Sequence, residues 1–200
     1  YVPNASVTPI VTYGGVLTDR SSVSNTAKAL EEQGHRVVAG INGDFYNVNN
    51  GLPIGIVVTQ GQLRSSDGGY HAIGFRSDGT AILGKPAVTM SVRYTAQDGT
   101  GEPLYNEAGE PLYDELGSPL TDGTGQISEK TLWPAAFNKA RTESGVYLYT
   151  YDFNASHTTG STQPGVDVVC TVQEGNFALG GTTSLLVERI AETEKEATSL

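Results

Sequence analysis

The sequence contains almost no cysteine and little histidine, and both shortages exclude kinds of site. Cys170 is the single cysteine, so the chain can form no internal disulfide and no cysteine-based zinc site. It lies in an alternating, strand-like segment without a basic neighbour or a helix start, which favours a small core residue over a nucleophile. The three histidines, His35, His71 and His157, are dispersed along the chain. We therefore expect no metal site and no cofactor.

Basic residues and long apolar runs are also scarce. Lys and Arg number 12 against 22 Asp and Glu, which gives a net charge of −10. Binding to a nucleic-acid backbone requires clustered cations, and here they are scattered, so we expect no nucleic-acid partner. No apolar run is long enough to cross a bilayer. No signal-peptide pattern is present, so we expect any targeting segment to have been removed or omitted.

Glycine and proline, by contrast, are plentiful, with 25 and 9 residues. They indicate many turns and short strands rather than long helices. One helix is predicted from about Val23 to Gln33, capped by Ser21 or Ser22 and ended by Gly34. The predicted fold class is therefore α+β, with one early helix and a mostly antiparallel or mixed β-sheet. Strand patterns cover residues 36–41, 54–59, 72–76, 80–83, 88–94, 147–150, 166–172 and 185–190. Turn residues at 60–61, before Leu63, and at 77–79 predict hairpins at these two places.

Residues 97–126 differ from the rest because they repeat with a period of eight. The copies span residues 101–106, 109–114 and 117–122, and each contains a Pro-Leu pair and an acidic or amide turn residue. Three short copies cannot build a solenoid core, so we expect an inserted loop or arm. Its Tyr and Leu side chains can form a partner-binding face, although packing of the loop on its own domain is the favoured interpretation.

The run Ile41-Asn42-Gly43-Asp44-Phe45-Tyr46 concentrates polar chemistry. It follows the apolar segment 36–41, which we expect to be a strand covered on both faces, and it places an amide, a carboxylate and a phenol within five residues. Polar groups at the end of a rigid strand commonly build sites. Asn, Gly and Asp are also the residues of tight turns, so the residues alone leave both interpretations open.

The order of motifs around this run resembles the phosphodiester glycosidase family, which has many exported bacterial members. The resemblance rests on residues 40–46, 51–58, 61–63 and 72–80, and more loosely on 138–141 and 147–150. The family's second signature, an Asp followed by several glycines and a Ser, has no counterpart here. The resemblance therefore implies one incomplete domain over residues 1–200, whose partner would be the missing C-terminal part of the same domain.

The resemblance implies a hydrolase that cleaves a sugar from a phosphodiester-linked glycan, outside the cell or at its surface. The leaving phosphate monoester is stable as an anion, so catalysis depends on stabilising an oxocarbenium-like centre and positioning a nucleophile or water. Asp44 is the predicted catalytic carboxylate. A guanidinium suits phosphate oxygens, and two arginines are therefore included among the predicted substrate-binding residues, which are Asn42, Gly43, Tyr46, Arg64 and Arg141.

Each of these assignments has a structural alternative. Asp44 can cap the turn that follows it, and other members of the family often have Gly at this position. Asn42 can form an Asx-turn, and Arg64 and Arg141 can be ordinary surface residues. For the whole chain, the alternative function is a non-catalytic module that binds a wall glycan or another partner.

Overall fold

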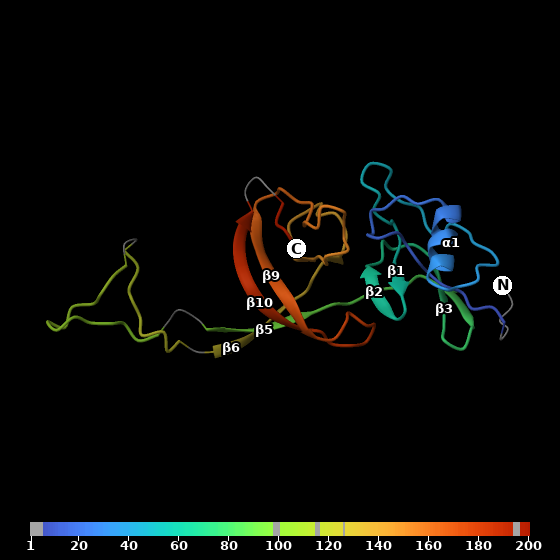
Figure 1. The fold of residues 1–200 in the computed structure, drawn as a ribbon. Coiled ribbons are helices and arrows are strands. Elements are labelled where there is room, and N and C mark those ends of the chain that lie inside the picture. The colour runs from blue at the N-terminus through green and yellow to red at the C-terminus, as the bar shows by residue number, and fades with distance from the viewer. Residues whose placement is uncertain (1–5, 98–100, 115–116, 126, 194–196) are drawn as a thin grey trace. The chain divides into compact units, whose positions relative to one another are not determined.

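The computed structural model describes residues 6–97, 101–114, 117–125, 127–193 and 197–200 (Figure 1). This part of the chain is mostly β, with one short helix and five two-stranded sheets, of which four are antiparallel. The predicted predominance of antiparallel strands is confirmed. The helical share is small, because α1 (Val23–Glu32) is the only helix among the described residues.

Helix α1 begins and ends where local chemistry predicts. The side chain of Ser22 accepts a hydrogen bond from the backbone N–H of Asn25 at 3.2 Å, which caps the first turn. Beyond the last turn, Gly34 adopts a φ of 92°, a conformation that glycine allows at low cost. The predicted helix is therefore confirmed at both ends.

Two hairpins follow at the predicted places. The first joins β1 (Val57–Thr59) to β2 (Gln62–Ser65), and its turn residues Gln60 and Gly61 both have positive φ, 51° and 76°. Such a pair is typical of the two-residue turns that match strand twist. The second hairpin joins β3 (Ala72–Phe75) to β4 (Ala81–Gly84).

The predicted strand at residues 36–41 is wrong. These residues form no strand, and the side chains of Val38 and Ile41 are 66% and 88% exposed. A strand requires a partner for its backbone groups. After the helix, the first backbone hydrogen bond to a separate segment is made by Phe45, whose carbonyl accepts from Ile54 N at 3.0 Å. The apolar run is therefore an exposed connection rather than a covered strand.

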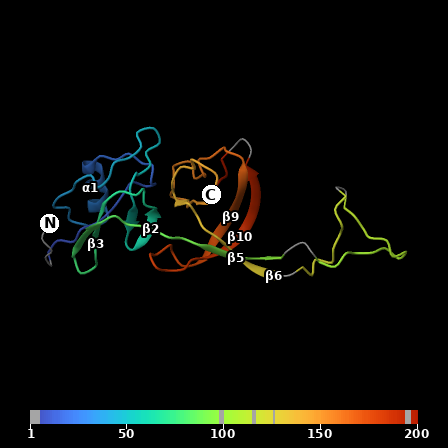
Figure 2. The same ribbon diagram turned by 180° about the vertical axis from the view of Figure 1, so that it is seen from behind.

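The last part of the chain contains a short parallel pair and a long antiparallel one. β7 (Ala136–Phe137) pairs with β8 (Tyr147–Leu148). β9 (Gly165–Glu174) pairs with β10 (Ser184–Thr193), as Figures 1 and 2 show. Alternation in β9 indicated one buried face, but the apolar residues on that face are exposed in the two-stranded ribbon. Those with the largest exposure are Val166, Val168, Val187 and Ile190, at 65%, 52%, 54% and 68%.

Cys170 is half-buried in β9, where it lies opposite Val187. Burial, followed by the nearby carboxylate of Glu188, raises the pKa of its thiol. A raised pKa leaves less thiolate at neutral pH. The side chain thus lacks the activation of a nucleophile, although it is not part of the core.

The chain divides into two compact units, a main unit of residues 1–89 and 135–200 and an insert unit of residues 90–134. In the insert unit, β5 (Val92–Gln97) and β6 (Ile127–Leu132) form an antiparallel ladder from Val92 opposite Leu132 to Gln97 opposite Ile127. The ladder brings the two ends of the insert together. An insertion whose ends already meet adds little loop-closure entropy to the folding of the host.

The three eight-residue copies form a closed ring of backbone hydrogen bonds. The N–H of Leu104 donates to the carbonyl of Leu120, that of Leu120 to Leu112, and that of Leu112 to Leu104, at 2.8–2.9 Å. Each copy therefore pairs with both others, which explains the strict period of the repeat. Residues 98–100, 115–116 and 126 of the predicted insertion lie outside the described residues.

The core of the main unit is small and contains a wholly buried amide. Asn138 has 0% exposure. Its Nδ2 donates to the carbonyl of Arg64 at 2.8 Å and to Oγ1 of Thr150 at 2.7 Å, while its Oδ1 accepts from Thr150 N at 2.8 Å. Because Arg64 precedes the insert unit and Thr150 follows it, Asn138 joins the two halves of the main unit. The apolar core residues are Val16, Leu17, Leu52, Val57, Leu63, Phe137 and Phe153.

Replacing Asn138 with Ala should destabilise the protein severely. The substitution leaves the carbonyl of Arg64 and the N–H of Thr150 without these partners, and it places Ala at a φ of 50°. We expect the free energy of unfolding to fall by about 3–5 kcal/mol in urea denaturation. The control Asn47→Ala removes one exposed turn bond and should cost about 0.5 kcal/mol or less. Similar losses for the two variants would contradict the joining role of Asn138.

Candidate functional site

A cavity of about 570 Å³ opens beside the Asn42–Tyr46 run. Of the predicted site residues, Asn42, Gly43 and Asp44 line it. The remaining lining residues are Phe45, Ile54, Tyr70 and His71, and sequence reasoning assigned neither Tyr70 nor His71 to a site. All seven residues are exposed, so the cavity is an open cleft that a ligand can enter from solvent.

The polar run is one arm of an irregular hairpin rather than a tight turn. Ile54 N donates to the carbonyl of Phe45 at 3.0 Å, and Asn47 N donates to the carbonyl of Leu52 at 2.9 Å. The turn itself lies at residues 47–51, where Asn47 accepts a backbone hydrogen bond from Gly51 N at 2.7 Å. The hairpin leaves Asn42 and Asp44 free of the turn, at the edge of the cavity.

Asp44 is held by backbone donors from both arms of this hairpin. Its Oδ1 accepts from Phe45 N and its Oδ2 from Gly55 N, both at 2.7 Å. A Cβ on Gly55 would lie 3.0 Å from Oδ2, so glycine allows the close approach. An ionised carboxylate has about four lone-pair positions. Each oxygen of Asp44 therefore keeps acceptor capacity for a ligand while its orientation is fixed.

Lys139 is a residue of this region that sequence reasoning missed. Its Nζ donates to the carbonyl oxygens of Pro53, Ile54 and Gly55 at 2.7, 3.1 and 2.8 Å. Burial lowers the pKa of its ammonium from 10.5 to about 8, although the carboxylates of Asp44 and Asp67 act in the opposite direction. The only sequence signal was its position in segment 138–141, which carries the looser part of the resemblance, because bonds to backbone carbonyls cannot be recognised from side-chain patterns.

The segment Asp67-Gly68-Gly69 packs against the same carbonyls. A Cβ on Gly68 would lie 2.3 Å from the carbonyl oxygen of Ile54, so only glycine fits there. Oδ1 of Asp67 accepts a hydrogen bond from Val88 N at 3.1 Å, which ties the segment to the chain beyond β4. Because Tyr70 and His71 follow directly, this packing brings their side chains to the cavity.

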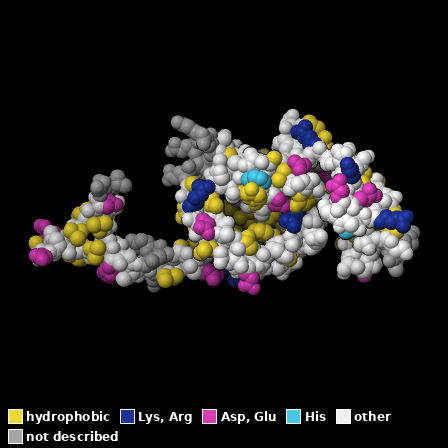
Figure 3. All heavy atoms as spheres, viewed as in Figure 1, with side chains coloured by type: hydrophobic (Ala, Val, Ile, Leu, Met, Phe, Trp, Pro, Cys, Tyr) yellow, Lys and Arg dark blue, Asp and Glu magenta, His cyan; other side chains and the backbone are white. Residues whose placement is uncertain are grey.

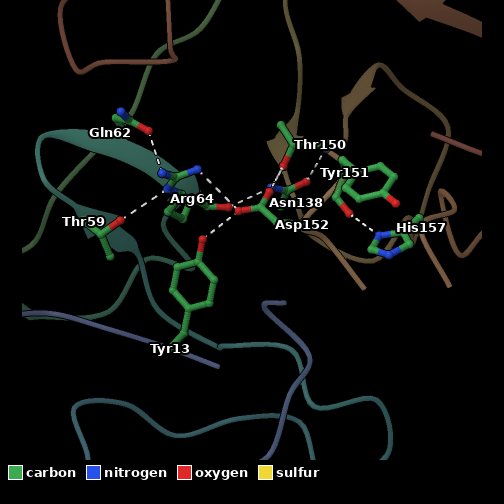
Figure 4. Close-up of polar contacts among 9 residues, drawn as sticks. All are labelled: Tyr13, Thr59, Gln62, Arg64, Asn138, Thr150, Tyr151, Asp152 and His157. Carbon is green, nitrogen blue, oxygen red and sulfur yellow. Dashed lines mark hydrogen bonds and ion pairs between the residues drawn. The ribbon is translucent and has the colours of Figure 1, made fainter. Parts of the chain in front are cut away.

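Arg64 belongs to a different polar cluster, shown in Figure 4. Its Nη1 lies 3.4 Å from Oδ2 of Asp152, its Nη2 donates to Oε1 of Gln62 at 2.6 Å, and its Nε donates to Oγ1 of Thr59 at 3.2 Å. The hydroxyl of Tyr13 donates to the same Oδ2 at 2.6 Å. Each nitrogen of the Arg64 guanidinium therefore donates to a protein group, and Arg64 does not line the cavity.

The ionisation of this cluster favours a charged Asp152. Burial alone would raise the pKa of its carboxyl, but hydrogen bonds from Thr150 and Tyr13 and the charge of Arg64 together lower it. Burial and the hydrogen bond to Asp152 raise the pKa of Tyr13 to about 12. The cluster is therefore a paired, partly buried network, and we assign it to the stability of the fold.

Arg141 and Tyr46 also lie apart from the cavity lining. Arg141 donates through Nη1 to the carbonyl of Gln163 at 3.2 Å and through Nη2 to that of Pro164 at 3.1 Å, just before β9. Tyr46 lies opposite Pro53 in the hairpin, with the guanidinium of Arg20 5.8 Å from its ring centre. The structure thus brings together three of the six predicted site residues.

Among the described residues, no group of three or more His, Cys, Asp and Glu side chains is arranged to hold a metal ion. On the face shown in Figure 3, Lys and Arg are scattered among Asp and Glu. Within the described residues, the structure contains no helix with the length and apolar character needed to cross a membrane.

Comparisons of this chain with protein-family models, with curated proteins and with solved structures found no match. A functional proposal therefore rests on the motifs of the sequence and on the geometry of the cavity. The relevant geometry is one oriented carboxylate, one amide, one imidazole and two exposed aromatic rings around an open cleft.

Replacing Asp152 with Asn tests the role of the second cluster. We expect a loss of about 1–3 kcal/mol in the free energy of unfolding at pH 7, because the ion pair with Arg64 and the charge-assisted bond from Tyr13 are lost. The pKa of Asp152 is lowered by folding. The wild-type advantage is therefore complete above the usual value of 3.8 and disappears as the pH falls below it.

Urea denaturation of both proteins from pH 7 to pH 2.5 measures this difference, with Glu31→Gln on the exposed helix as the control. A constant difference between wild type and Asp152→Asn over that range would contradict the ionisation of Asp152 in the fold.

Proposed function

We propose that this chain is a hydrolase-type domain, resembling phosphodiester glycosidases, that releases a sugar from a phosphodiester-linked glycan outside the cell or at its surface. The observation that carries the proposal is the cavity in which Asn42 and Asp44 lie beside Tyr70 and His71. A volume of about 570 Å³ lies within the range of small-molecule sites. The motif resemblance around residues 40–63 supports the same substrate class.

The proposed reaction breaks the bond between the anomeric carbon and the phosphate oxygen. The electron pair of that bond leaves with the phosphate monoester, and water supplies the hydroxyl of the released sugar while its proton passes to solvent. Asp44 stabilises the positive charge that develops at the anomeric carbon. Its two backbone hydrogen bonds fix its orientation, so no reorganisation is needed as the charge develops.

The other lining residues supply binding contacts in this proposal. The amide of Asn42 can both donate to and accept from sugar hydroxyls. Phe45 and Tyr70, 79% and 59% exposed, offer flat apolar faces to a sugar ring. Because Arg64 and Arg141 are engaged elsewhere, the phosphate contact passes to the imidazole of His71.

One observation favours a non-catalytic alternative. Among the described residues, Asp44 is the only carboxylate that lines the cavity, whereas glycosidases ordinarily use a pair of carboxyl groups. A good leaving group reduces the need for a general acid, so one carboxylate is compatible with turnover. A module that binds an anionic glycan without cleaving it would instead show saturable binding and no released sugar.

Release of N-acetylglucosamine from an N-acetylglucosamine 1-phosphodiester tests the proposal. We expect Asp44→Ala to lower kcat/KM by roughly 100-fold or more and Asn42→Ala by about tenfold. The control Asp78→Ala removes an exposed carboxylate in the β3–β4 turn and should leave the rate unchanged. Absence of sugar release by the wild type, or full activity of both cavity variants with normal circular dichroism, would contradict the assignment.

A further inference from the structure

We propose that Lys139 is the positioning residue of the cavity: its ammonium group holds the segment from Pro53 to Gly55, and that segment fixes the carboxylate of Asp44. The effect on ligand binding rests on the proposed function. The effect on the segment itself concerns only contacts within the chain and can be tested without a ligand.

The hydrogen bonds of Lys139 place it behind the cavity rather than in it. A lysine ammonium has three N–H donors, and three consecutive carbonyl oxygens, of Pro53, Ile54 and Gly55, accept from it. No donor remains for a phosphate or a sugar hydroxyl. Lys139 therefore acts on a ligand through the backbone that it holds.

Gly55 transmits this hold to Asp44. Its carbonyl accepts from Nζ of Lys139 at 2.8 Å, and its N–H donates to Oδ2 of Asp44 at 2.7 Å. The preceding residue, Ile54, lines the cavity and also accepts from Nζ. Movement of this segment would change both the wall of the cavity and the orientation of its only carboxylate.

Lys139 itself is anchored beside the buried core of the main unit. It follows Asn138, which is wholly buried and bonded to Arg64 and Thr150. A functional group is most accurately placed when packed and hydrogen-bonded neighbours support it. The ammonium group therefore links the core to an exposed hairpin whose arms belong to none of the five sheets.

Burial of Lys139 disfavours its charged form and so opposes folding while the ammonium is protonated. The groups that face it are the carboxylates of Asp44 and Asp67, and burial still lowers its pKa from 10.5 to about 8. Between these two values the unfolded chain keeps a proton that the folded chain has lost, so the lysine's contribution to folding stability rises with pH. The hold on the carbonyls weakens over the same range, because a neutral amine has two N–H donors instead of three.

Folding stability and the hold on the carbonyls therefore change in opposite directions with pH. This difference distinguishes a residue that positions the segment from one that only stabilises the fold. The first measurement is the NMR chemical shift of the Gly55 amide in the ligand-free 200-residue chain, from pH 6.5 to 9.5. We expect a titration with a midpoint near 8 in the wild type and none in Lys139→Arg, which stays charged. An invariant Gly55 shift in the wild type, or the same titration in Lys139→Met, would overturn the proposal.

The second measurement is the affinity, by calorimetry, for the methyl ester of the C-glycosyl phosphonate analogue of N-acetylglucosamine 1-phosphate, which has no anomeric C–O–P bond to hydrolyse. We expect the wild type to lose about tenfold in affinity between pH 7 and 9.5, Lys139→Arg to keep its affinity, and Lys139→Met to bind about tenfold more weakly at pH 7. The exposed Lys85→Met variant is the matched control and should behave as the wild type.

The two measurements distinguish the two proposals. Absence of binding by the wild type at every pH, with a normal Gly55 titration, would contradict the proposed function and support the hold on the segment. Binding of equal strength in wild type and Lys139→Met at pH 7 would contradict the positioning of Asp44 and support the cavity as a ligand site.

Discussion

The main unit depends on one buried amide. Asn138 satisfies backbone groups of Arg64 and Thr150 at the same time, and these residues come from parts of the sequence that the insert unit separates. The cost of leaving such groups buried and unpaired is larger than the gain from any single surface bond, so this side chain holds the two halves together more strongly than a surface contact would. Its left-handed φ of 50°, which asparagine tolerates better than most residues, gives a second reason for this residue type.

The sequence predicts the elements of this fold that local chemistry determines. Helix α1 was found because Ser22 and Gly34 mark its ends, and the β1–β2 and β3–β4 hairpins were found because turn residues separate their strands. Residues 36–41 were predicted wrongly, because an apolar run does not reveal whether another strand lies beside it. The ring of leucines in the insert unit could not be predicted for the same reason, since its hydrogen bonds join three separate copies of the repeat.

In the candidate site too, local features were predictable from the sequence and contacts between distant segments were not. Asn42, Gly43 and Asp44 are neighbours in the sequence, so their shared place at the cavity follows from the chain itself. Asp152, the ion-pair partner of Arg64, and the carbonyls before β9 that Arg141 binds lie far away in the sequence. A guanidinium is equally suited to phosphate and to such protein acceptors. Residues that act through backbone contacts, Lys139 above all, leave no side-chain pattern to read.

The site combines an exposed hairpin with the ammonium group of Lys139, which is anchored beside the core. The hairpin at residues 45–54 contributes few backbone pairs, and such segments open at low free energy. Lys139 supplies the missing rigidity through three carbonyls, and the lowered pKa of its ammonium shows that burial opposes this arrangement. A methionine of similar length would avoid that penalty but could not hold the carbonyls. Retention of an ionised group where burial disfavours it is typical of functional sites, and here it orients the one carboxylate that faces the cavity.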